Sequence, residues 1–495
     1  MKQLPGRAEC CWTATAPETS YPRLQGHKRF DVVIVGGGIV GLTAALQVAW
    51  AGQKVAVVEA LRIGRQVTGR STAKITTQHG LIYRHLIDTL GTEKARLYAN
   101  ANDTAFHYIE RLVADHGLDC DYETKDAFVY VGPGSDRRDD LDTEAQAARS
   151  LGLDAEVLEA APLPFPTGGA LRYPRQAQFN PAKYLIAAAS LATAAGVSVF
   201  EHTRVENVEL GSRWRVHAAD GEIDAQDVLV ATNIPVAGPQ DYDAMVQPRC
   251  HLAMAFRIDP QHAPNGMFIA AEEPFHSIRT GRDGSGLVLM VLGPRFNTGQ
   301  EADVAGRFRE LEEWVRKNFR VSDVGWRWTN EDMDSADRLA LVGAPNQGSG
   351  FYVATGFNAW GITNGTAAGM LVADQILGRA NPWSLLFDPA RPYPKDFNQG
   401  GSTATPLDGI ADISAGEGGV IEHEGEKLAV WKDEGGIVHA VSAMCTHKGC
   451  FVTWNNADRT WDCPCHGSMF ASNGSVIHGP AVEPLAVRSV PGKQR

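Results

Sequence analysis

The sequence predicts an α/β chain that ends in a smaller all-β domain. Two observations support this fold class. A glycine-rich turn joins a buried strand to a helix within residues 31–59, and cysteines and histidines cluster among short strand-like runs at 445–468. The chain has 495 residues, enough for about three domains. We therefore expect a nucleotide-binding domain, an interleaved α+β domain and a separate β domain.

The N-terminal part contains a complete strand–helix–strand unit. Residues 31–35 form an apolar run typical of a buried parallel strand, and residues 42–50 are rich in helix formers. Three glycines between them have the spacing of a pyrophosphate-binding turn: Gly36, Gly38 and Gly41. Glu59 ends the second strand, where a carboxylate can bind a ribose hydroxyl. This unit predicts a Rossmann-like site for NAD or FAD.

Two more buried strands, 228–232 and 351–356, end in turns of small residues, and the second leads to a helix at 367–377. Together with the glycine-rich unit, these segments resemble the D-amino-acid oxidase/sarcosine oxidase superfamily of flavoproteins over residues 31–390. The resemblance implies FAD, which we expect to be bound non-covalently. In that superfamily, a helix N-terminus reaches the flavin, and its dipole favours the anionic reduced form.

The same resemblance implies particular cofactor contacts. Ser71 and Thr72 lie in a small polar turn that contacts the flavin cofactor in that superfamily, and Val205 matches a strand residue near the adenine. The segment before the last helix contributes four more expected contacts: Gly356, Gly361, Ile362 and Thr363. It also implies how the chain is divided. We expect FAD-binding parts at about 31–85, 150–235 and 330–390, and a substrate domain at about 86–149 and 236–329. Residues 1–30 are expected to form an irregular N-terminal segment, and 391–407 a linker rich in Pro, Gly, Ser and Thr.

Two helices are predicted in the substrate domain. Residues 92–116 have an inward apolar stripe, with Thr92 as a candidate N-cap and Gly117 past the end. Residues 301–318 form a charged helix between strand-like runs.

The C-terminal cluster offers two cysteines and two histidines at short spacing: Cys445, His447, Cys463 and His466. Such a set suits tetrahedral zinc or a [2Fe–2S] cluster with thiolates on one iron and histidines on the other. A second cysteine pair, Cys450 and Cys465, is not needed by a zinc finger and could close a disulfide over a cluster.

Residues 408–495 resemble the Rieske iron–sulfur domain of the cytochrome bc-complex type, including its proline loop at 479–481. The resemblance implies that Cys445 and Cys463 bind one iron, that His447 and His466 bind the other, and that Cys450 and Cys465 form a disulfide.

Two departures from that family change the expected properties of the cluster. Phe470 replaces a tyrosine whose hydroxyl donates to a cysteine sulfur, so only Ser468 can do so here. We expect a potential below the top of the range of roughly −150 to +300 mV. Lys448 replaces an apolar residue at the quinol dock, which favours a polar electron partner.

Composition narrows the choice of partners. A net charge of −12 disfavours nucleic acid and anionic membrane surfaces. We find no secretory signal or membrane span in the sequence, and expect a cytoplasmic protein. The remaining cysteines are expected to be reduced thiols: Cys10, Cys11, Cys120 and Cys250.

The substrate residues are less well defined by the sequence. Lys74, His79 and Trp360 are the candidate catalytic residues, and Arg249 and His251 could also reach the flavin. The sarcosine-type pattern has a lysine where Thr363 stands here, and often a histidine at Trp360. These differences favour a larger or more apolar amine as the substrate.

Three functions fit this pair of cofactors. In the first, the enzyme oxidises an amine or amino-acid-like substrate at a CH–N bond and passes electrons through the cluster to an external one-electron carrier. In the second, a carrier reduces the cluster and the flavin reduces the substrate. In the third, the chain is a redox-sensing or assembly module.

Overall fold

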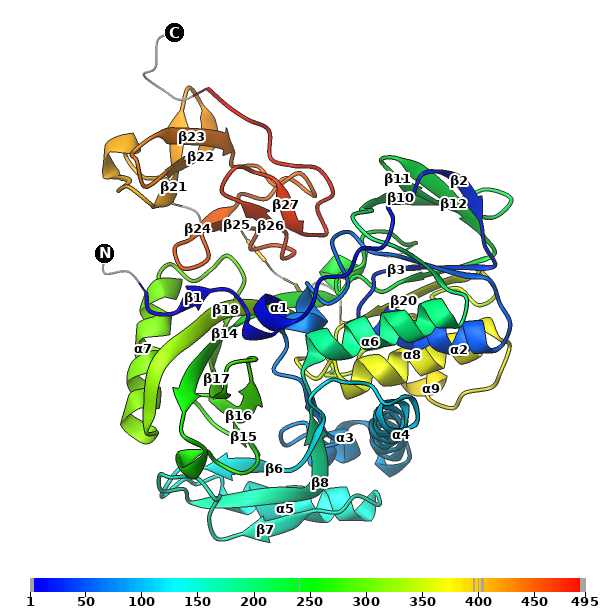
Figure 1. Cartoon of the computed structure of the whole chain (residues 1–495), viewed down its shortest axis with the longest axis vertical. Coiled ribbons are helices and arrows are strands. Elements are labelled where there is room, and N and C mark those ends of the chain that lie inside the picture. Colours follow the sequence, from blue (N-terminus) through cyan, green and yellow to red (C-terminus); the bar gives the residue numbers. More distant parts are fainter. Residues whose placement is uncertain (1–3, 240, 395–396, 399, 402–404, 490–495) are drawn as a thin grey trace.

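The computed structural model describes residues 4–239, 241–394, 397–398, 400–401 and 405–489. Figure 1 shows a larger body of sheets and helices with a smaller all-β domain on one side of it. This arrangement confirms the predicted fold class.

A mostly parallel sheet forms the centre of the nucleotide-binding part. Its strands, in spatial order, are β19 (Leu341–Gly343), β20 (Phe351–Thr355), β13 (Asp227–Val230), β3 (Val32–Val35), β4 (Val55–Val58) and β9 (Ser198–Phe200). Val32 and Ile34 of β3 belong to one hydrophobic core, whereas Val33 and Val35 belong to another. The continuous apolar run of β3 therefore reflects burial on both faces of the sheet.

Helices cover one face of this sheet, and a small sheet covers the other (Figure 1). The helices are α2 (Ile39–Trp50), α6 (Pro181–Ala194) and α8 (Thr363–Ile376). The small sheet contains, in order, β10 (Val205–Leu210), β11 (Trp214–Ala218), β12 (Gly221–Ala225) and β2 (Gly26–Arg29). Helix α8 begins at Thr363, four residues before the predicted start.

Two glycines allow α8 to pack directly against α2. A Cβ on Gly365 would lie 2.9 Å from Ile39 Cγ2, and a Cβ on Gly369 would lie 2.7 Å from the carbonyl oxygen of Val40. The close contact sets the N-terminus of α8 beside that of α2, at the edge where the glycine-rich turn lies.

A large mixed sheet forms the second half of the body. Its strands, in order, are β1 (Arg7–Ala8), β18 (Val321–Ser335), β14 (Val246–Ile258), β17 (Leu287–Asn297), β16 (Ser277–Arg282), β15 (Met267–Ala270), β6 (Glu123–Val131), β8 (Gly169–Gln178) and β5 (Lys74–Ile75), with β7 (Glu156–Leu158) on β8. We expected residues 150–178 in the FAD-binding part, and the structure differs. Strands β7 and β8 belong to the large sheet because β8 pairs with β6 along its length.

Further helices pack around the large sheet and beside α8. They are α1 (Cys11–Thr15), α3 (Tyr83–Leu90), α4 (Thr92–His116), α5 (Arg138–Ser150), α7 (Val304–Asn318) and α9 (Ser384–Phe387). Thr92 is the first residue of α4 and not its N-cap, which is Gly91. Gly117 ends α4 in the left-handed conformation, as the sequence predicted. In the described part of the chain, every helix is too short or too polar to cross a bilayer.

The N-terminal segment is regular where irregular structure was expected. Strand β1 pairs with β18, and β2 pairs with β12. Cys10, Cys11 and Trp12 are buried, and the indole of Trp12 donates a hydrogen bond to the carbonyl oxygen of Ser71 at 2.9 Å. Burial of these apolar side chains fixes a segment that has too little periodicity to be predicted.

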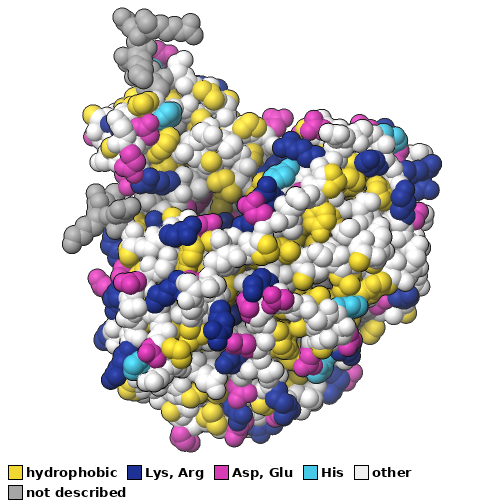
Figure 2. Space-filling view, in the orientation of Figure 1, with side chains coloured by type: hydrophobic (Ala, Val, Ile, Leu, Met, Phe, Trp, Pro, Cys, Tyr) yellow, Lys and Arg dark blue, Asp and Glu magenta, His cyan; other side chains and the backbone are white. Residues whose placement is uncertain are grey.

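The C-terminal β domain consists of two antiparallel sheets. One contains β21 (Gly418–His423), β22 (Glu426–Lys432) and β23 (Val438–Ser442), and the other β24 (Thr453–Asn455), β25 (Thr460–Asp462), β26 (Met469–Ala471) and β27 (Val476–His478). The expected linker 391–407 lies partly outside the described residues. Figure 2 shows this domain as a lobe on the larger body, with acidic and basic side chains interspersed on the visible face.

The contact between α2 and α8 yields a test. Gly369→Ala places a methyl group against the backbone of α2, so we expect the free energy of unfolding to fall by about 1–3 kcal/mol. Gly286→Ala is the control, because a Cβ there would come no closer than 3.7 Å to any neighbour. Urea denaturation of both variants measures the difference. Equal stability of the two would show that the helices do not need this contact.

Candidate functional site

The turn after β3 opens into a cleft with an empty volume of about 1340 Å³, part of it open to solvent. The predicted cofactor residues that line it are Gly36, Gly38, Glu59, Ser71, Val205, Gly361 and Ile362. A Cβ on Gly38 would meet only Thr68 Oγ1, at 3.3 Å, so the space in front of Gly38 is free. The exposed backbone at the start of α2 is therefore suited to a phosphate group.

Glu59 lies at the end of β4, inside this cleft. Its carboxylate accepts hydrogen bonds from the backbone N–H groups of Gly37 and Leu61, both at 2.9 Å. Burial raises the pKa of Glu59, although these two hydrogen bonds oppose the shift. Each oxygen keeps a lone pair that could accept from a ribose hydroxyl.

Four predicted cofactor residues lie outside the lining of this cleft. Gly41 packs under the turn, where a Cβ would lie 2.0 Å from the carbonyl oxygen of Gly36. Thr72 and Thr363 line a second cavity. Gly356 lines neither cavity, and its φ of +75° lets the chain turn after β20.

The second cavity adjoins the first and has an empty volume of about 620 Å³. Ser71, Ala359 and Ile362 line both. The three candidate catalytic residues, Lys74, His79 and Trp360, line this cavity. His251, Phe275 and Arg295 are among its other lining residues. The structure thus brings together residues from distant parts of the sequence into a mixed apolar and cationic wall.

His79 is held as a neutral side chain. Its Nε2 faces the carbonyl oxygen of Thr76 at 2.9 Å, so Nε2 carries the proton, and Nδ1 accepts from the Tyr98 hydroxyl at 2.7 Å. Burial lowers the pKa of His79 to about 3. The ring stacks on Trp360 with centroids 4.7 Å apart. His79 therefore shapes the wall and is not available as a base.

Lys74 is the titratable group of this cavity. Burial lowers its pKa to about 7, and the nearby charge of Arg279 adds to the shift. Its ammonium group contacts the hydroxyl of Ser277. Near neutral pH, Lys74 can therefore be charged or neutral according to what enters the cavity.

Arg295 is a cavity residue that the sequence analysis missed, whereas Arg249, which could have reached the flavin, lies outside the cavity. Arg249 does not line the cavity; it lies 3.3 Å from Asp334, which Arg295 also contacts. His251 and Arg295 are direct partners across β14 and β17. Only this strand pairing brings the two side chains together, and no spacing in the sequence reveals it.

Two loops of the C-terminal domain bring the four predicted metal ligands together. Cys445 and His447 follow β23, and Cys463 and His466 follow β25. The two imidazole rings have centroids 5.0 Å apart. A hydrogen bond with the Cys463 thiol lowers the pKa of Cys445 to about 7.

The unpaired atoms of these loops fit a metal centre. Nδ1 of His447 and Nδ1 of His466 are both buried without a hydrogen-bond partner in the structure. Buried polar atoms normally have a partner, so these two nitrogens are free for metal. The two buried thiols beside them complete a set of two sulfurs and two nitrogens.

Groups around this site brace its loops. Cys450 and Cys465 form a disulfide, with Cα atoms 6.4 Å apart. The Ser468 side chain interacts with Cys445 by a hydrogen bond and accepts one from the backbone N–H of Ala481 at 3.0 Å. Phe470 is buried and carries no hydroxyl.

Residues 31–375 match the family described as FAD dependent oxidoreductase (DAO), which accounts for most of the chain. The chain belongs to this family. Residues 404–491 match the Rieske [2Fe-2S] domain. The enzyme is therefore an FAD-dependent oxidoreductase that also binds a [2Fe–2S] cluster. These matches confirm the prediction of FAD over NAD and of an iron–sulfur cluster over zinc.

A relative has the same two-part organisation. YhfW of Bacillus subtilis, named as a Rieske 2Fe-2S iron-sulfur protein, is 30% identical over 96% of this chain and 97% of its own. Solved structures share the fold of the larger body. Glycine oxidase from Geobacillus kaustophilus has a TM-score of 0.58 at 19% identity, covering 74% of this chain and all of its own. L-proline dehydrogenase from P. horikoshii has a TM-score of 0.60 at 18% identity, covering 75% and 98%.

The Rieske domain completes the wall of the FAD cleft. Ile477, His478, Gly479 and Val482 line that cleft together with the turn of the family's FAD-binding part. Gln66 donates to the carbonyl oxygen of Ile477 at 3.1 Å, so the two parts are joined beside the cofactor position.

A buried carboxylate lies between the FAD cleft and the loop at 463–468, which is called the cluster loop below. Glu331 of β18 contacts Nε2 of His478 at 3.2 Å and accepts from the Thr298 hydroxyl at 2.7 Å. A Cβ on Gly467 would lie 2.6 Å from the same carboxylate. Gly467 directly follows His466, so the contact places a proposed cluster ligand close to the residues that line the FAD cleft.

The disulfide beside the cluster site yields a test. Cys450→Ser should leave the cluster bound but easily lost, because a cross-link of 15 residues restrains the loops by about 3 kcal/mol. Loss of visible absorbance under a chelator measures the rate. Cys120→Ser, a buried cysteine far from the cluster in the sequence, is the control. A Cys450→Ser cluster as durable as the parent's would contradict the bracing role.

Proposed function

We propose that this oxidoreductase oxidises an amine or amino-acid-like substrate in the second cavity and passes the electrons through the Rieske domain to an external one-electron acceptor. The observation that carries the proposal is the position of the FAD cleft. It adjoins the second cavity through Ser71, Ala359 and Ile362, and Rieske residues 477–479 line another part of it. The substrate cavity and the Rieske domain therefore adjoin different parts of the same FAD cleft.

The chemistry of the second cavity supports this class of substrate. Lys74 and Arg295 offer positive charge to a carboxylate, whereas Trp360 and Phe275 offer apolar surface. The solved structures of similar fold include a glycine oxidase and an L-proline dehydrogenase. An amine that carries a carboxylate and an apolar side chain would satisfy both kinds of wall.

When bound, FAD supplies two-electron hydride chemistry and a [2Fe–2S] cluster supplies one-electron transfer. The residues of the chain orient the partners. Lys74 holds or releases a proton at Nζ near neutral pH, and His79 fixes the indole of Trp360 by stacking. Glu331 and His478 hold the cluster loop against the cofactor cleft.

The proposed site of action is the cytoplasm. Cys10, Cys11, Cys120 and Cys250 are buried and free in the structure. Unpaired cysteines in this number are typical of a reducing compartment. Cys465 is buried and Cys450 is half-buried, which limits the access of reductants to their disulfide.

Rapid anaerobic mixing with a panel of amines and amino acids tests the direction of electron flow. We expect flavin absorbance to fall first and cluster reduction to follow, because the substrate cavity adjoins the FAD cleft. Cluster reduction by a carrier before any flavin change would favour the reductase, and no reduction with any donor would favour a redox-sensing role. Either result would overturn the proposal.

Lys74 should give ligand binding a defined pH dependence. Its ammonium attracts a carboxylate below pH 7 and is lost as the pH rises through about 7. Binding of benzoate, followed by the flavin spectrum, should therefore weaken about tenfold per pH unit above that point. Lys74→Met should bind weakly with little pH dependence, and Lys94→Met, an exposed change on α4, should behave as the parent does. A parent profile that is flat from pH 6 to 9 would exclude this role.

A further inference from the structure

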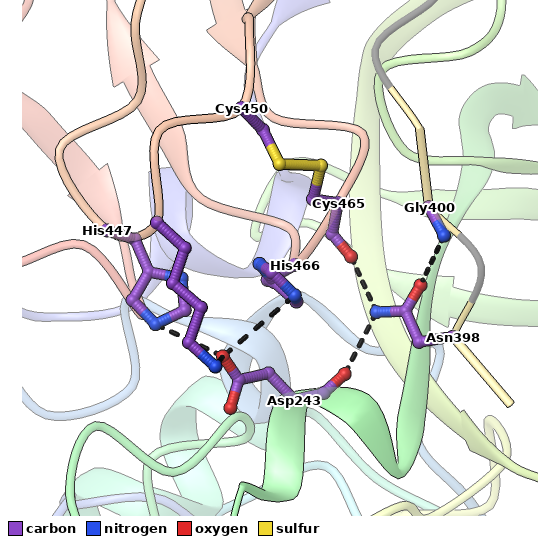
Figure 3. Close-up of a disulfide and its surroundings, with 8 residues drawn as sticks. Asp243, Asn398, Gly400, His447, Cys450, Cys465 and His466 are labelled. Carbon is purple, nitrogen blue, oxygen red and sulfur yellow. Dashed lines mark hydrogen bonds and ion pairs between the residues drawn. A yellow bond between two sulfur atoms is a disulfide. The ribbon is translucent and has the colours of Figure 1, made fainter. Parts of the chain in front are cut away.

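A carboxylate of the larger body lies beside both histidines of the cluster site. Asp243 Oδ2 lies 3.1 Å from Nε2 of His447 and 4.0 Å from Nε2 of His466. Lys448 Nζ lies 3.0 Å from the same oxygen. Figure 3 shows Asp243 pointing up from the larger body toward both imidazoles, below the disulfide. Nothing in the sequence motifs of the Rieske domain marks this residue, which lies about 200 positions earlier in the chain.

The two nitrogens of each imidazole have different surroundings. Nδ1 of both rings is buried without a partner, whereas Nε2 of both rings lies within 4.0 Å of Asp243 Oδ2. An imidazole that binds metal through Nδ1 keeps its proton on Nε2 and donates it to a neighbouring acceptor. Asp243 Oδ2 lies at ion-pair distance from Nε2 of His447 and further from Nε2 of His466, without a hydrogen bond to either, so the carboxylate acts on both rings through its charge.

The backbone around Asp243 is tied to the cluster loop. The side-chain nitrogen of Asn398 donates to the carbonyl oxygen of Asp243 at 2.9 Å and to that of Cys465 at 2.5 Å (Figure 3). Tyr242, the residue before Asp243, is buried. The carboxylate is therefore fixed relative to the cluster loop, and only a tenth of its side chain is exposed.

We propose that Asp243 is a positioning residue that sets a negative charge beside the outer nitrogens of the histidine ligands and lowers the reduction potential of the cluster. The proposal uses the cluster site and does not depend on the substrate or on the direction of electron flow.

The charge of Asp243 acts on the cluster site in one direction. A fixed negative charge next to the ligands opposes the arrival of an electron, and more strongly in a site shielded from water. Asp243 Oδ2 lies only 3.1 Å from Nε2 of His447, so this charge is close to the ligand. Lys448 offsets part of this charge, but it also pairs with Asp241 at 2.6 Å and is half-exposed.

The same contact closes the histidine end of the cluster site. The side chains of His447 and His466 are 19% and 16% exposed, and the body of the enzyme lies against their outer nitrogens. In this arrangement the partner of the histidines is the larger body of the same chain, so an external acceptor meets the Rieske domain elsewhere.

Potentiometric titration of the holoenzyme with redox mediators, followed by EPR of the reduced cluster, tests the proposal without any substrate. Asp243→Asn should raise the midpoint potential above that of the parent. Asp241→Asn is the matched control, because it removes the same charge and contacts the same lysine but makes no ion pair with either histidine. It should shift the potential much less.

The proposal would be overturned if Asp243→Asn and Asp241→Asn shifted the midpoint potential equally. It would also be overturned if Asp243→Asn kept the potential of the parent. If Asp243→Asn retains no cluster, Asp243→Glu and Asp241→Glu replace the pair, since all charges are then kept. Asp243→Glu moves the carboxylate against the rings, so it should alter the histidine nitrogen couplings in pulsed EPR and shift the potential. Asp241→Glu should change neither, and identical spectra for the two would contradict the role of Asp243.

Discussion

Two carboxylates buried at the joint between the flavin-binding part and the Rieske domain hold the arrangement together. Asp243 meets the histidines of the cluster site, and Glu331 meets His478 and the backbone at Gly467. A buried carboxylate that loses its partner costs several kcal/mol. Both groups have a cationic or ionisable partner of the Rieske domain within 3.2 Å in this arrangement, so the cost of burying them favours this docking.

The docking gives the FAD cleft a wall from each of three regions. The glycine-rich turn lines one side, strand β18 of the large sheet supplies Asn330 and Asp332, and strand β27 of the Rieske domain supplies His478. A cofactor that exchanges two electrons on one side and single electrons on another needs both sides accessible within one protein. The fold meets that need by packing the Rieske domain against the cleft.

Local sequence patterns were sufficient to predict the structure where a segment folds through contacts within itself. The strand–turn–helix at 31–59 and helix α4 follow from glycine spacing and apolar periodicity, and the cluster ligands follow from two short motifs. They were insufficient where partners are distant. The N-terminal segment is ordered by burial of Trp12, and β7 and β8 join the large sheet through pairing with β6. Neither contact leaves a periodic pattern in the residues involved.

The sequence alone determined the two cofactors, because the glycine-rich turn and the cysteine and histidine motifs each lie within a short stretch of the chain. Only the tertiary structure decided how the two sites meet. Asp243, Glu331 and Arg295 carry no motif, and each acts on a residue more than 40 positions away or across a pair of strands. Charges acquire such roles through the distance and burial that folding imposes, and these are properties of the packed chain.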